Sequence, residues 1–136
     1  MKRQIVINDP RTAQFIADSV GSTDCECHGS VGLEVDGRIV AGATFDNYNG
    51  KNVFIHFSSS HSLRVFSRDL LRMVFGFAFG VLKVQRVSGA FSSANRKVCR
   101  LGEIIGFQFE ARLRDACPDG DMMIYRLNRE DCRFLP

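Results

Sequence analysis

The sequence has no apolar run long enough to span a bilayer, and its N-terminal residues, MKRQIVINDP, lack the apolar core of a secretion signal. We therefore expect a cytoplasmic protein with no membrane partner. No repeat, linker or low-complexity segment divides the 136 residues. We expect one domain over residues 1–136, large enough to bury roughly two-thirds of its unfolded surface.

The sequence also lacks a run of basic residues and a basic patch interleaved with aromatic side chains. Domains that bind nucleic acid usually carry such a patch, because they neutralise phosphates. The formal net charge is only +3. These features argue against a nucleic-acid partner, which would require a row of arginines described below to be exposed along its whole length.

The five cysteines are an odd number. We expect free thiols, because a disulfide framework is rare in the cytoplasm. Cys25, Cys27 and His28 lie close enough together to suggest a metal site, but no second pair of ligands follows at a useful distance. Since a closed zinc site needs four ligands, we expect no bound metal.

The N-terminal part of the chain predicts a strand followed by a helix. Residues 2–8 end in an apolar triplet, which is typical of a short strand. Asp9 and Pro10 form a helix start, with a side-chain acceptor before a proline whose missing N–H costs nothing there. Apolar residues then recur at helical spacing until Gly21, which supplies the stop.

Tight turns at Asp36-Gly37 and Asn49-Gly50 separate three segments of alternating apolar residues. The remaining order is a long helix, a strand, a second helix that ends at Gly106, and two strands joined by a turn at Asp119-Gly120. This predicts an α+β (α/β) fold with a mixed sheet of about seven strands flanked by helices. The sheet should be mostly antiparallel, with one parallel pair formed by the strands on either side of the long helix. The expected strands fall at residues 2–8, 31–35, 38–45, 53–58, 85–92, 107–113 and 122–127, and the expected helices at 9–20, 63–82 and 94–105.

The chain is organised around the helix expected over residues 63–82. Its second half is apolar nearly all round, so it belongs in the core. His61, Arg64, Arg68 and Arg72 recur along one face at its start, and four serines precede or open it. Free backbone N–H groups and the helix dipole favour an anion at such an end, although an ordinary capped helix with solvated arginines fits the same pattern.

Residues 95–115, NRKVCRLGEIIGFQFEARLRD, resemble the signature of the GNAT superfamily of N-acetyltransferases. In that signature an asparagine opens a helix that ends in Gly-Phe and is followed by a strand with an acidic residue and an arginine. The resemblance extends back to the strand at residues 53–57 and covers more than half of the chain. It is strongest to the branch that acetylates N-terminal amines of ribosomal proteins and related substrates.

The resemblance implies acetyl-CoA as the donor. The pantetheine arm would lie between the strands that flank the long helix, and the family's pyrophosphate loop falls on residues 62–67. Ser62 and Val65 depart from that loop's pattern, and Val65 replaces a glycine with a branched side chain that resists unusual dihedrals. Arg64 and Arg68 would add charged contacts to the phosphates. The implied cofactor-binding residues are Phe57, Ser58, Ser59, Leu63, Arg64, Val65, Phe66, Ser67, Arg68 and Asn95.

The chemistry requires a base for the amine and an acid or water for the departing thiolate. Many relatives place a tyrosine acid where this sequence has Gly102, and neither Tyr48 nor Tyr125 matches that position. His56 is the best-placed base, because it lies beside the implied thioester and titrates near neutral pH. A strand histidine that is simply packed or solvent-facing fits the same position.

His61 and Ser59 follow as candidate catalytic residues, and Glu34 or Asp46 would relay a proton through water. Cys99 is expected to be a small buried residue rather than a nucleophile.

These features predict a GNAT-fold N-acetyltransferase that transfers an acetyl group from acetyl-CoA to an amine by direct attack. The acceptor is a small molecule, a protein N-terminus or a lysine, and the sequence leaves a homodimer open. The alternative is a catalytically weak GNAT-fold binding or inhibitory protein that acts on a protein partner. The loops expected to select the acceptor, residues 22–30 and 116–121, contain no recognition motif.

Overall fold

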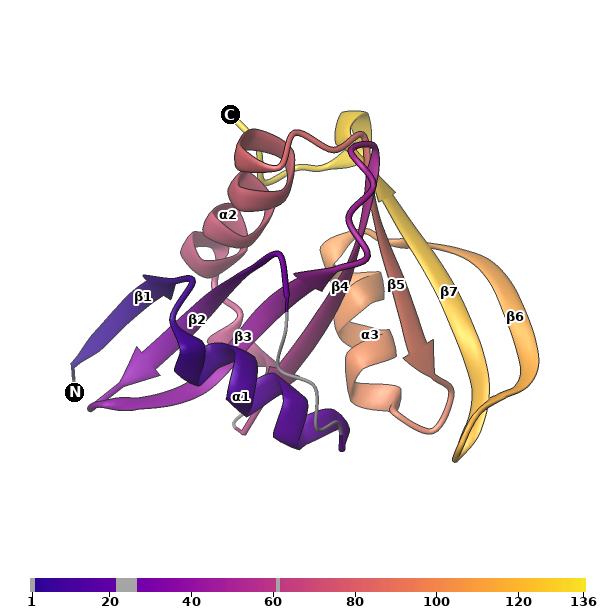
Figure 1. The fold of residues 1–136 in the computed structure, drawn as a ribbon, viewed down its shortest axis with the longest axis horizontal. Coiled ribbons are helices and arrows are strands. Elements are labelled where there is room, and N and C mark those ends of the chain that lie inside the picture. The colour runs from indigo at the N-terminus through magenta and orange to yellow at the C-terminus, as the bar shows by residue number, and fades with distance from the viewer. Residues whose placement is uncertain (1, 22–26, 61) are drawn as a thin grey trace.

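The computed structural model of the chain describes residues 2–21, 27–60 and 62–136 (Figure 1). Its strands and helices follow the predicted order. The elements are β1 (Arg3–Ile7), α1 (Pro10–Val20), β2 (Gly29–Val35), β3 (Arg38–Asp46), β4 (Asn52–Ser59), η1 (Leu63–Val65), α2 (Arg68–Gly76), η2 (Phe77–Val81), β5 (Arg86–Ser92), α3 (Arg96–Ile105), β6 (Gln108–Cys117), β7 (Gly120–Asn128) and η3 (Arg129–Asp131).

One seven-stranded sheet forms the body of the molecule, in the order β1-β2-β3-β4-β5-β7-β6. Every neighbouring pair is antiparallel except β4 and β5, which are parallel. The predicted mixed sheet and its single parallel pair are therefore confirmed. The parallel pairing is short, because it joins Asn52–Ile55 to Arg86–Gly89 and then stops, and beyond it the two strands diverge (Figure 1).

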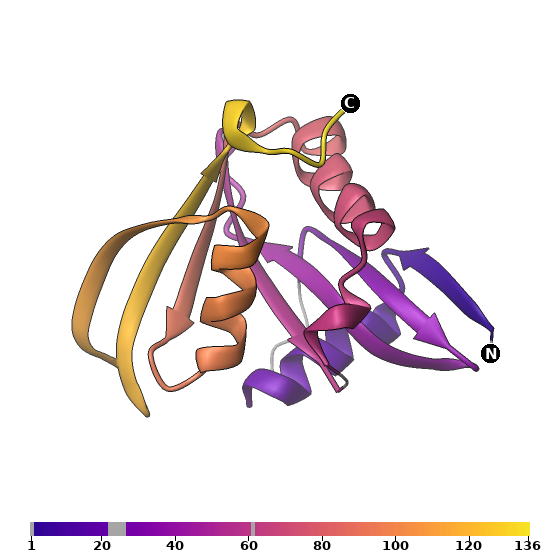
Figure 2. The ribbon, with the colours of Figure 1, turned by 180° about the vertical axis from the view of Figure 1, so that it is seen from behind.

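The sheet lies between two helical layers. The helix α1 covers one face of β2, β3 and β4, while α2 and α3 lie on the other face (Figures 1 and 2). Two glycines that are partners across β2 and β3, Gly32 and Gly42, let α1 approach closely. A Cβ atom on Gly42 would lie 2.8 Å from the carbonyl oxygen of Val31 and 2.9 Å from the Cγ2 atom of Thr12 on α1. These glycines therefore set the spacing between α1 and the sheet.

The core lies between the sheet and the layer of α2 and α3, and phenylalanines dominate it. Phe57 on β4 contacts the rings of Phe66, Phe91 and Phe107, with centroid distances of 5.8, 6.4 and 6.3 Å. Burial alternates along β4, as the period of a strand requires. Val53, Ile55 and Phe57 are buried in this core, while Asn52, Phe54, His56 and Ser58 on the opposite face are half-buried.

The predicted helix ends at both termini of α1 are confirmed. The Asp9 side chain accepts a hydrogen bond from the backbone of Arg11, and Pro10 occupies the first turn. Gly21 ends the helix in the left-handed region at φ 73°. Gly106 ends α3 in the same region, at φ 118°, as its place in the sequence predicts.

The single helix expected over residues 63–82 is wrong in its extent. A short 3-10 turn at η1 comes first, α2 begins only at Arg68, and the chain continues into the π-helical turn η2. Ser67 causes the late start, because its extended backbone and its side chain, which accepts from the Leu70 N–H, form the N-cap. Arg64 therefore does not lie on the first turn of α2. Across the described part of the chain, each helix is too short or too polar to span a bilayer.

The second half of this segment is also less uniformly apolar than its composition indicates. Leu70, Leu71, Val74 and Phe75 are buried, but Met73 on the same helix is 43% exposed and Val81 is 66% exposed. Arg68 and Arg72 share the exposed side with Met73. The helix is amphipathic because only one side of it faces the sheet.

Candidate functional site

Two adjoining cavities occupy the opening where β4 and β5 diverge. The larger, of about 420 Å³, is lined by His56 and Phe57 of β4, by the end of β5 and by the turn between β6 and β7. The smaller, of about 260 Å³, is lined by the end of β4, the segment after it and the first turn of α3. Phe57, Asn95 and Val98 line both cavities. Together the cavities form a continuous cleft between the strands.

The cleft exists because the two strands choose different partners beyond their short pairing. β4 continues to pair with β3 as far as Ser59, and β5 continues to pair with β7 as far as Ser92. The ring of Phe91 folds back over Gly89, the last residue of β5 that pairs with β4. A Cβ atom on Gly89 would lie 2.4 Å from the Cζ atom of Phe91, so this ring position requires a glycine.

The end of β4 supplies the three residues predicted there, and all of them line the smaller cavity. Phe57 is buried, while Ser58 and Ser59 are half-buried. The Ser58 hydroxyl donates to the hydroxyl of Ser19 on α1 over 2.6 Å. The Ser59 carbonyl accepts from the Lys97 ammonium over 3.2 Å. This wall of the cleft is therefore held from both sides.

The segment after β4 contributes unevenly to the cleft. Leu63 and Phe66 line the smaller cavity, as predicted. Arg64, Val65, Ser67 and Arg68 are not among the residues that line either cavity. The two arginines are exposed, Val65 is half-buried in η1, and Ser67 is engaged as the N-cap of α2.

Lys97 is the basic side chain among the residues that line the two cavities. The sequence does not single it out, because the arginines at the start of the long helix recur at helical spacing and Lys97 belongs to no such row. One signal was available: Lys97 stands two positions after Asn95, on the first turn of the helix that the asparagine opens. A long side chain there reaches back across the helix start to the end of β4, which its 3.2 Å contact with Ser59 shows.

Asn95 lines both cavities and also forms the N-cap of α3. Its Oδ1 atom accepts a hydrogen bond from the Val98 N–H over 3.2 Å. The structural role is therefore observed, and the side chain stands at the centre of the cleft. A contact between Asn95 and the co-substrate, which the resemblance implies, stays a prediction.

His56 lies on the face of β4 opposite Phe57, and its side chain is 32% exposed. Its Nε2 atom lies 2.8 Å from the Oδ2 atom of Asp46 on the neighbouring strand. A carboxylate only accepts, so this contact places the hydrogen on Nε2 and leaves the lone pair of the neutral ring on Nδ1. His56 is therefore held in one tautomer at the wall of the larger cavity.

Asp46 and Glu34, the two carboxylates that would relay a proton, have different partners. Asp46 contacts His56 directly rather than through water. Glu34 instead accepts from Arg11 over 2.9 Å and from Gln4 over 3.1 Å, and the hydrogen bond from Arg11 is the main reason that its pKa is lowered. Glu34 therefore belongs to a surface network around α1. The expectation for His61 lies outside the described residues.

The tyrosine acid of the family has no counterpart in the cleft. Gly102 is buried, and a Cβ atom there would touch Phe91 at 3.4 Å. The Tyr48 hydroxyl donates to the Leu82 carbonyl, and Tyr125 is buried so that desolvation raises its pKa. Neither tyrosine lines the cleft.

Of the described cysteines, Cys117 lines the larger cavity of the cleft, whereas Cys27, Cys99 and Cys132 line neither cavity. Burial raises the pKa of the Cys99 thiol, which keeps it protonated at neutral pH. Cys27 and His28 are exposed, and Cys25 lies outside the described residues. Among the described residues there is no group of three potential ligands that would hold a metal ion.

No protein-family model and no curated protein matches the chain, whereas solved structures do. The spermidine/spermine N-acetyltransferase SpeG of Vibrio cholerae matches with a TM-score of 0.70 over 95% of this chain and 96% of its own, at 12% identity. The Campylobacter jejuni N-acetyltransferase PseH, in complex with acetyl coenzyme A, matches with a TM-score of 0.56 over 74% and 67%, at 19% identity.

This chain has the fold of the GNAT acetyltransferases. A third structure, described as a probable acetyltransferase, matches with a TM-score of 0.61 and 22% identity over 74% of this chain. The matched region covers 61% of that protein, so the chain spans less than two thirds of its length. The likeness to the branch that acts on ribosomal proteins stays a prediction.

Proposed function

We propose that this protein is an N-acetyltransferase that moves an acetyl group from acetyl-CoA to an amine. The observation that carries the proposal is the cleft between β4 and β5, because a parallel pair that parts over its second half leaves two strand edges facing a cavity. An extended ligand with amide groups is recognised by adding to such an edge. The N-acetyltransferase SpeG shares the whole architecture.

The residues of the cleft fit the proposed co-substrate. The cavities of about 260 and 420 Å³ adjoin at Phe57, and sites for small molecules occupy roughly 300 to 1,000 Å³. The backbone of Phe57 to Ser59 would hold the pantetheine amides, and Asn95 would add a side-chain hydrogen bond. The acetyl thioester that acetyl-CoA supplies when bound is an acyl donor that a neutral amine attacks directly.

The segment of residues 62–68 is the proposed binding place for the diphosphate. It precedes the first turn of α2, whose backbone N–H groups lack partners within the helix. Lys97 of α3 lines the smaller cavity, which Leu63 and Phe66 of this segment also line. Arg64 and Arg68 are exposed, belong to this segment and would contact phosphate oxygens from the solvent side of the diphosphate. This arrangement would offset the missing loop glycine at Val65.

His56 is the proposed base. With Nε2 bound to Asp46, its Nδ1 lone pair would accept the proton that the amine loses when the carbonyl carbon is attacked. The departing thiol has an ordinary pKa of about 8.5, so water suffices to protonate it, and no tyrosine at the position of Gly102 is required.

A catalytically weak binding or inhibitory protein is the second candidate function. Two observations favour it: Val65 stands in place of a glycine of the pyrophosphate loop, and Gly102 is packed in the core where relatives carry the acid. Such a protein would keep the fold and present its surface to a protein partner. Turnover therefore decides between the two candidates.

Native mass spectrometry with CoA tests the cofactor, and the variant His56→Gln tests the base. We expect a bound CoA mass shift in both proteins and a fall in kcat of about a hundredfold or more in the variant, with nearly unchanged CoA affinity. An unaltered pH–rate profile in His56→Gln would remove His56 from the mechanism. Absence of CoA binding at millimolar concentration would favour the second candidate.

The acceptor class is proposed as a small amine, a protein N-terminus or a lysine. We also propose that the chain forms a homodimer. The structural neighbour SpeG is dodecameric in one of its structures. Light scattering of the purified chain checks the oligomeric state. A monomer across the concentration range would end the dimer proposal without affecting the cleft.

A further inference from the structure

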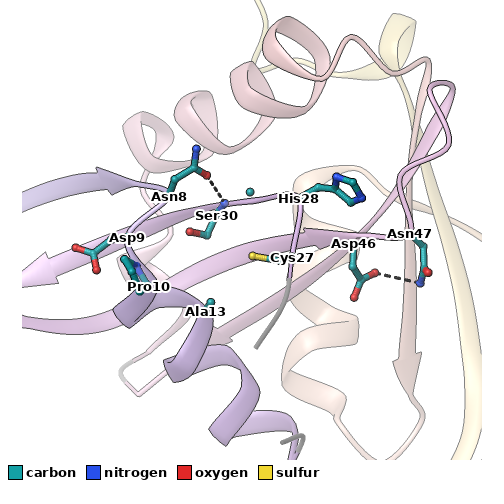
Figure 3. Close-up of a pocket in the computed structure, with 10 residues that line it drawn as sticks. Asn8, Asp9, Pro10, Ala13, Cys27, His28, Ser30, Asp46 and Asn47 are labelled. Atoms are coloured by element: carbon teal, nitrogen blue, oxygen red, sulfur yellow. Dashed lines mark hydrogen bonds between the residues drawn. The ribbon is translucent and has the colours of Figure 1, made fainter. Parts of the chain in front are cut away.

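The cavity beside the start of α1 gives no route to the proposed base. It has a volume of about 870 Å³ and is formed by the start of α1, the start of β2 and the end of β3 (Figure 3). Its two carboxylates already have partners, because Arg11 contacts Asp9 and His56 contacts Asp46, each at 2.8 Å. Among the described residues that line it, none also lines the cleft between β4 and β5. His56 is instead open to the larger cavity of the cleft.

The larger cavity passes from one face of the sheet to the other. Phe57 and Phe91 line it, and their rings contact each other on the core face. His56 and Ala90 precede them on the same strands and line the cavity from the opposite face, because successive strand residues alternate. Val20, at the end of α1, lines the cavity on this second face and is 55% exposed. The cavity therefore opens to solvent beside the end of α1.

A row of apolar side chains continues from this opening across the sheet. On this face α1 covers β2, β3 and β4, and no described helix covers β5, β7 and β6 (Figure 1). Residues directly opposite each other in neighbouring strands share a face. Ala90 is opposite Ile124, which is opposite Ala111, and Met122 in the next row is opposite Leu113. We refer to these five residues as the apolar strip.

The apolar strip is open to solvent and carries no charge. Leu113 is 45% exposed, and the other four residues are half-buried. The backbone of β7 pairs with β5 on one side and with β6 on the other, so the strip offers side-chain surface rather than hydrogen-bonding groups. Ala90 belongs both to the strip and to the lining of the larger cavity. The strip is therefore an apolar extension of that cavity.

The charged residues beside the strip do not favour a second cation. Arg126 lies two residues beyond the strip on β7 and so has the same face. Glu110 contacts Arg86 at 2.8 Å and Arg126 at 3.0 Å, so two guanidinium groups share one carboxylate and the group keeps a net positive charge. The Asp119 carboxylate, at the rim of the larger cavity, accepts a hydrogen bond from the Ser92 hydroxyl over 2.6 Å.

The size of the strip fits part of a small molecule rather than a protein partner. The strip is three strands wide and two rows long, which corresponds to about 10 Å by about 7 Å. A stable protein interface covers about 800 Å² on each partner. A single hydrocarbon chain, which needs no hydrogen-bond partner, matches the extent and the chemistry of the strip.

We propose that the acceptor is a primary amine that carries an uncharged apolar chain, and that this chain lies on the apolar strip. The amine enters the larger cavity and reaches His56, while the chain crosses Ala90 and Ile124 toward Leu113. The amine nitrogen bonds to the acetyl carbon, the carbon–sulfur bond of the thioester breaks, His56 takes the proton of the amine, and water protonates the departing thiolate. This inference rests on the proposed function and specifies its acceptor.

Two amines of equal size test the acceptor class. 1-Heptylamine and 1,6-diaminohexane have the same number of non-hydrogen atoms, but the first ends in a methyl group and the second in an ammonium group. Each is titrated by calorimetry into the protein with and without saturating CoA. We expect heptylamine to bind roughly tenfold more tightly or better, because the second ammonium would lose its hydration on an uncharged surface. From 1-butylamine to 1-heptylamine, the affinity should rise about two- to fourfold for each methylene.

Variants of the strip locate the chain. Leu113→Thr removes apolar surface at the end of the strip, and Ile124→Thr removes it in the middle. Both should lower the affinity for heptylamine about threefold or more, and Leu113→Thr should leave butylamine binding unchanged. Ile7→Thr is the matched control, because Ile7 is 42% exposed on the edge strand β1, at the other end of the sheet from β6. Leu113→Asp adds a carboxylate and should shift the preference toward the diamine.

Equal binding of heptylamine and the diamine, tighter binding of the diamine, or a heptylamine affinity that survives in both threonine variants of the strip overturns the inference. If these variants leave amine binding unchanged and turn a dimer into a monomer in light scattering, the strip is a subunit interface and the inference is wrong. CoA binding is measured separately in the same proteins. If CoA binds and the amines are not distinguished, only this inference fails. If heptylamine is preferred through the strip and CoA does not bind, the strip recognises an apolar amine but the proposed acetyl transfer is wrong.

Discussion

Replacing Lys97 with methionine tests where the diphosphate of CoA binds. Lys97 lies on the first turn of α3, and its ammonium contacts the Ser59 carbonyl at 3.2 Å on the wall of the smaller cavity. Methionine keeps the length and apolar character of the stem and removes only the charge. Arg64 and Arg68 provide the comparison, because they are exposed as Lys97 is, but neither of them lines the cavity.

The expected size of the effect follows from the position of the charge. A hydrogen bond to a charged group contributes about 1.5 to 3 kcal/mol, so losing one at the wall of the cavity raises the dissociation constant of CoA roughly tenfold or more. A charge that lies outside the cavity and only acts on the ligand through solvent contributes much less, since water and salt screen it. We therefore expect Lys97→Met to weaken binding roughly tenfold, and Arg64→Ala to weaken it by less than about threefold.

Calorimetric titration of CoA and of dephospho-CoA measures both effects. The ratio between Lys97→Met and the wild type should be the same for the two ligands if Lys97 contacts the diphosphate rather than the 3′-phosphate. Lys97→Arg keeps the charge and should retain most of the affinity. The reasoning is refuted if Lys97→Met binds as the wild type does while Arg64→Ala or Arg68→Ala loses about tenfold, because the diphosphate would then lie on the outer side of the turn.

Three further predictions concern stability and reactivity. Gly42→Ala should destabilise the fold by about 1 to 3 kcal/mol in denaturant unfolding, because the new Cβ would lie 2.8 Å from a backbone oxygen. Gly76→Ala, where a Cβ would have nothing within 4 Å, should instead stabilise α2 by about 0.5 to 1 kcal/mol. An equal loss of stability in both variants would contradict the packing argument. The pKa of Glu34 is lowered, mainly by the hydrogen bond from the Arg11 guanidinium. The ionised Glu34 therefore stabilises the fold fully above the unfolded pKa of about 4.3, and this stabilisation is lost as pH falls through the folded pKa. Glu34→Gln should reduce the difference in melting temperature between pH 7 and pH 3. Cys99, whose pKa is raised by burial, should react with iodoacetamide more slowly than the exposed Cys27, and equal rates by peptide mass mapping would contradict its assignment as an inert thiol.

Local sequence determined the boundaries of most elements. Asp9 with Pro10 and the glycine at Gly21 predict both ends of α1, because caps act over one turn and need no distant partner. Asp36-Gly37 predicts its hairpin for the same reason, with φ values of 49° and 86°. The prediction of one long helix was wrong at Ser67, which caps α2. Four other serines nearby carry the same local signal, and only the geometry of the folded chain selects among them.

The cleft was located in the sequence through the resemblance of residues 95–115 and the placement of the two strands that flank the long segment. Tertiary structure alone decided which side chains face it. Lys97 lines the cavity and the arginines do not, because the path of α3 rather than the spacing within one helix sets that distance. The contact of His56 with Asp46 joins residues on neighbouring strands, and one cavity gathers lining residues from the start of α1, the start of β2 and the end of β3. Sequence patterns record which face of an element is apolar; the meeting of polar side chains from separate elements depends on register and packing, which exist only in the folded chain.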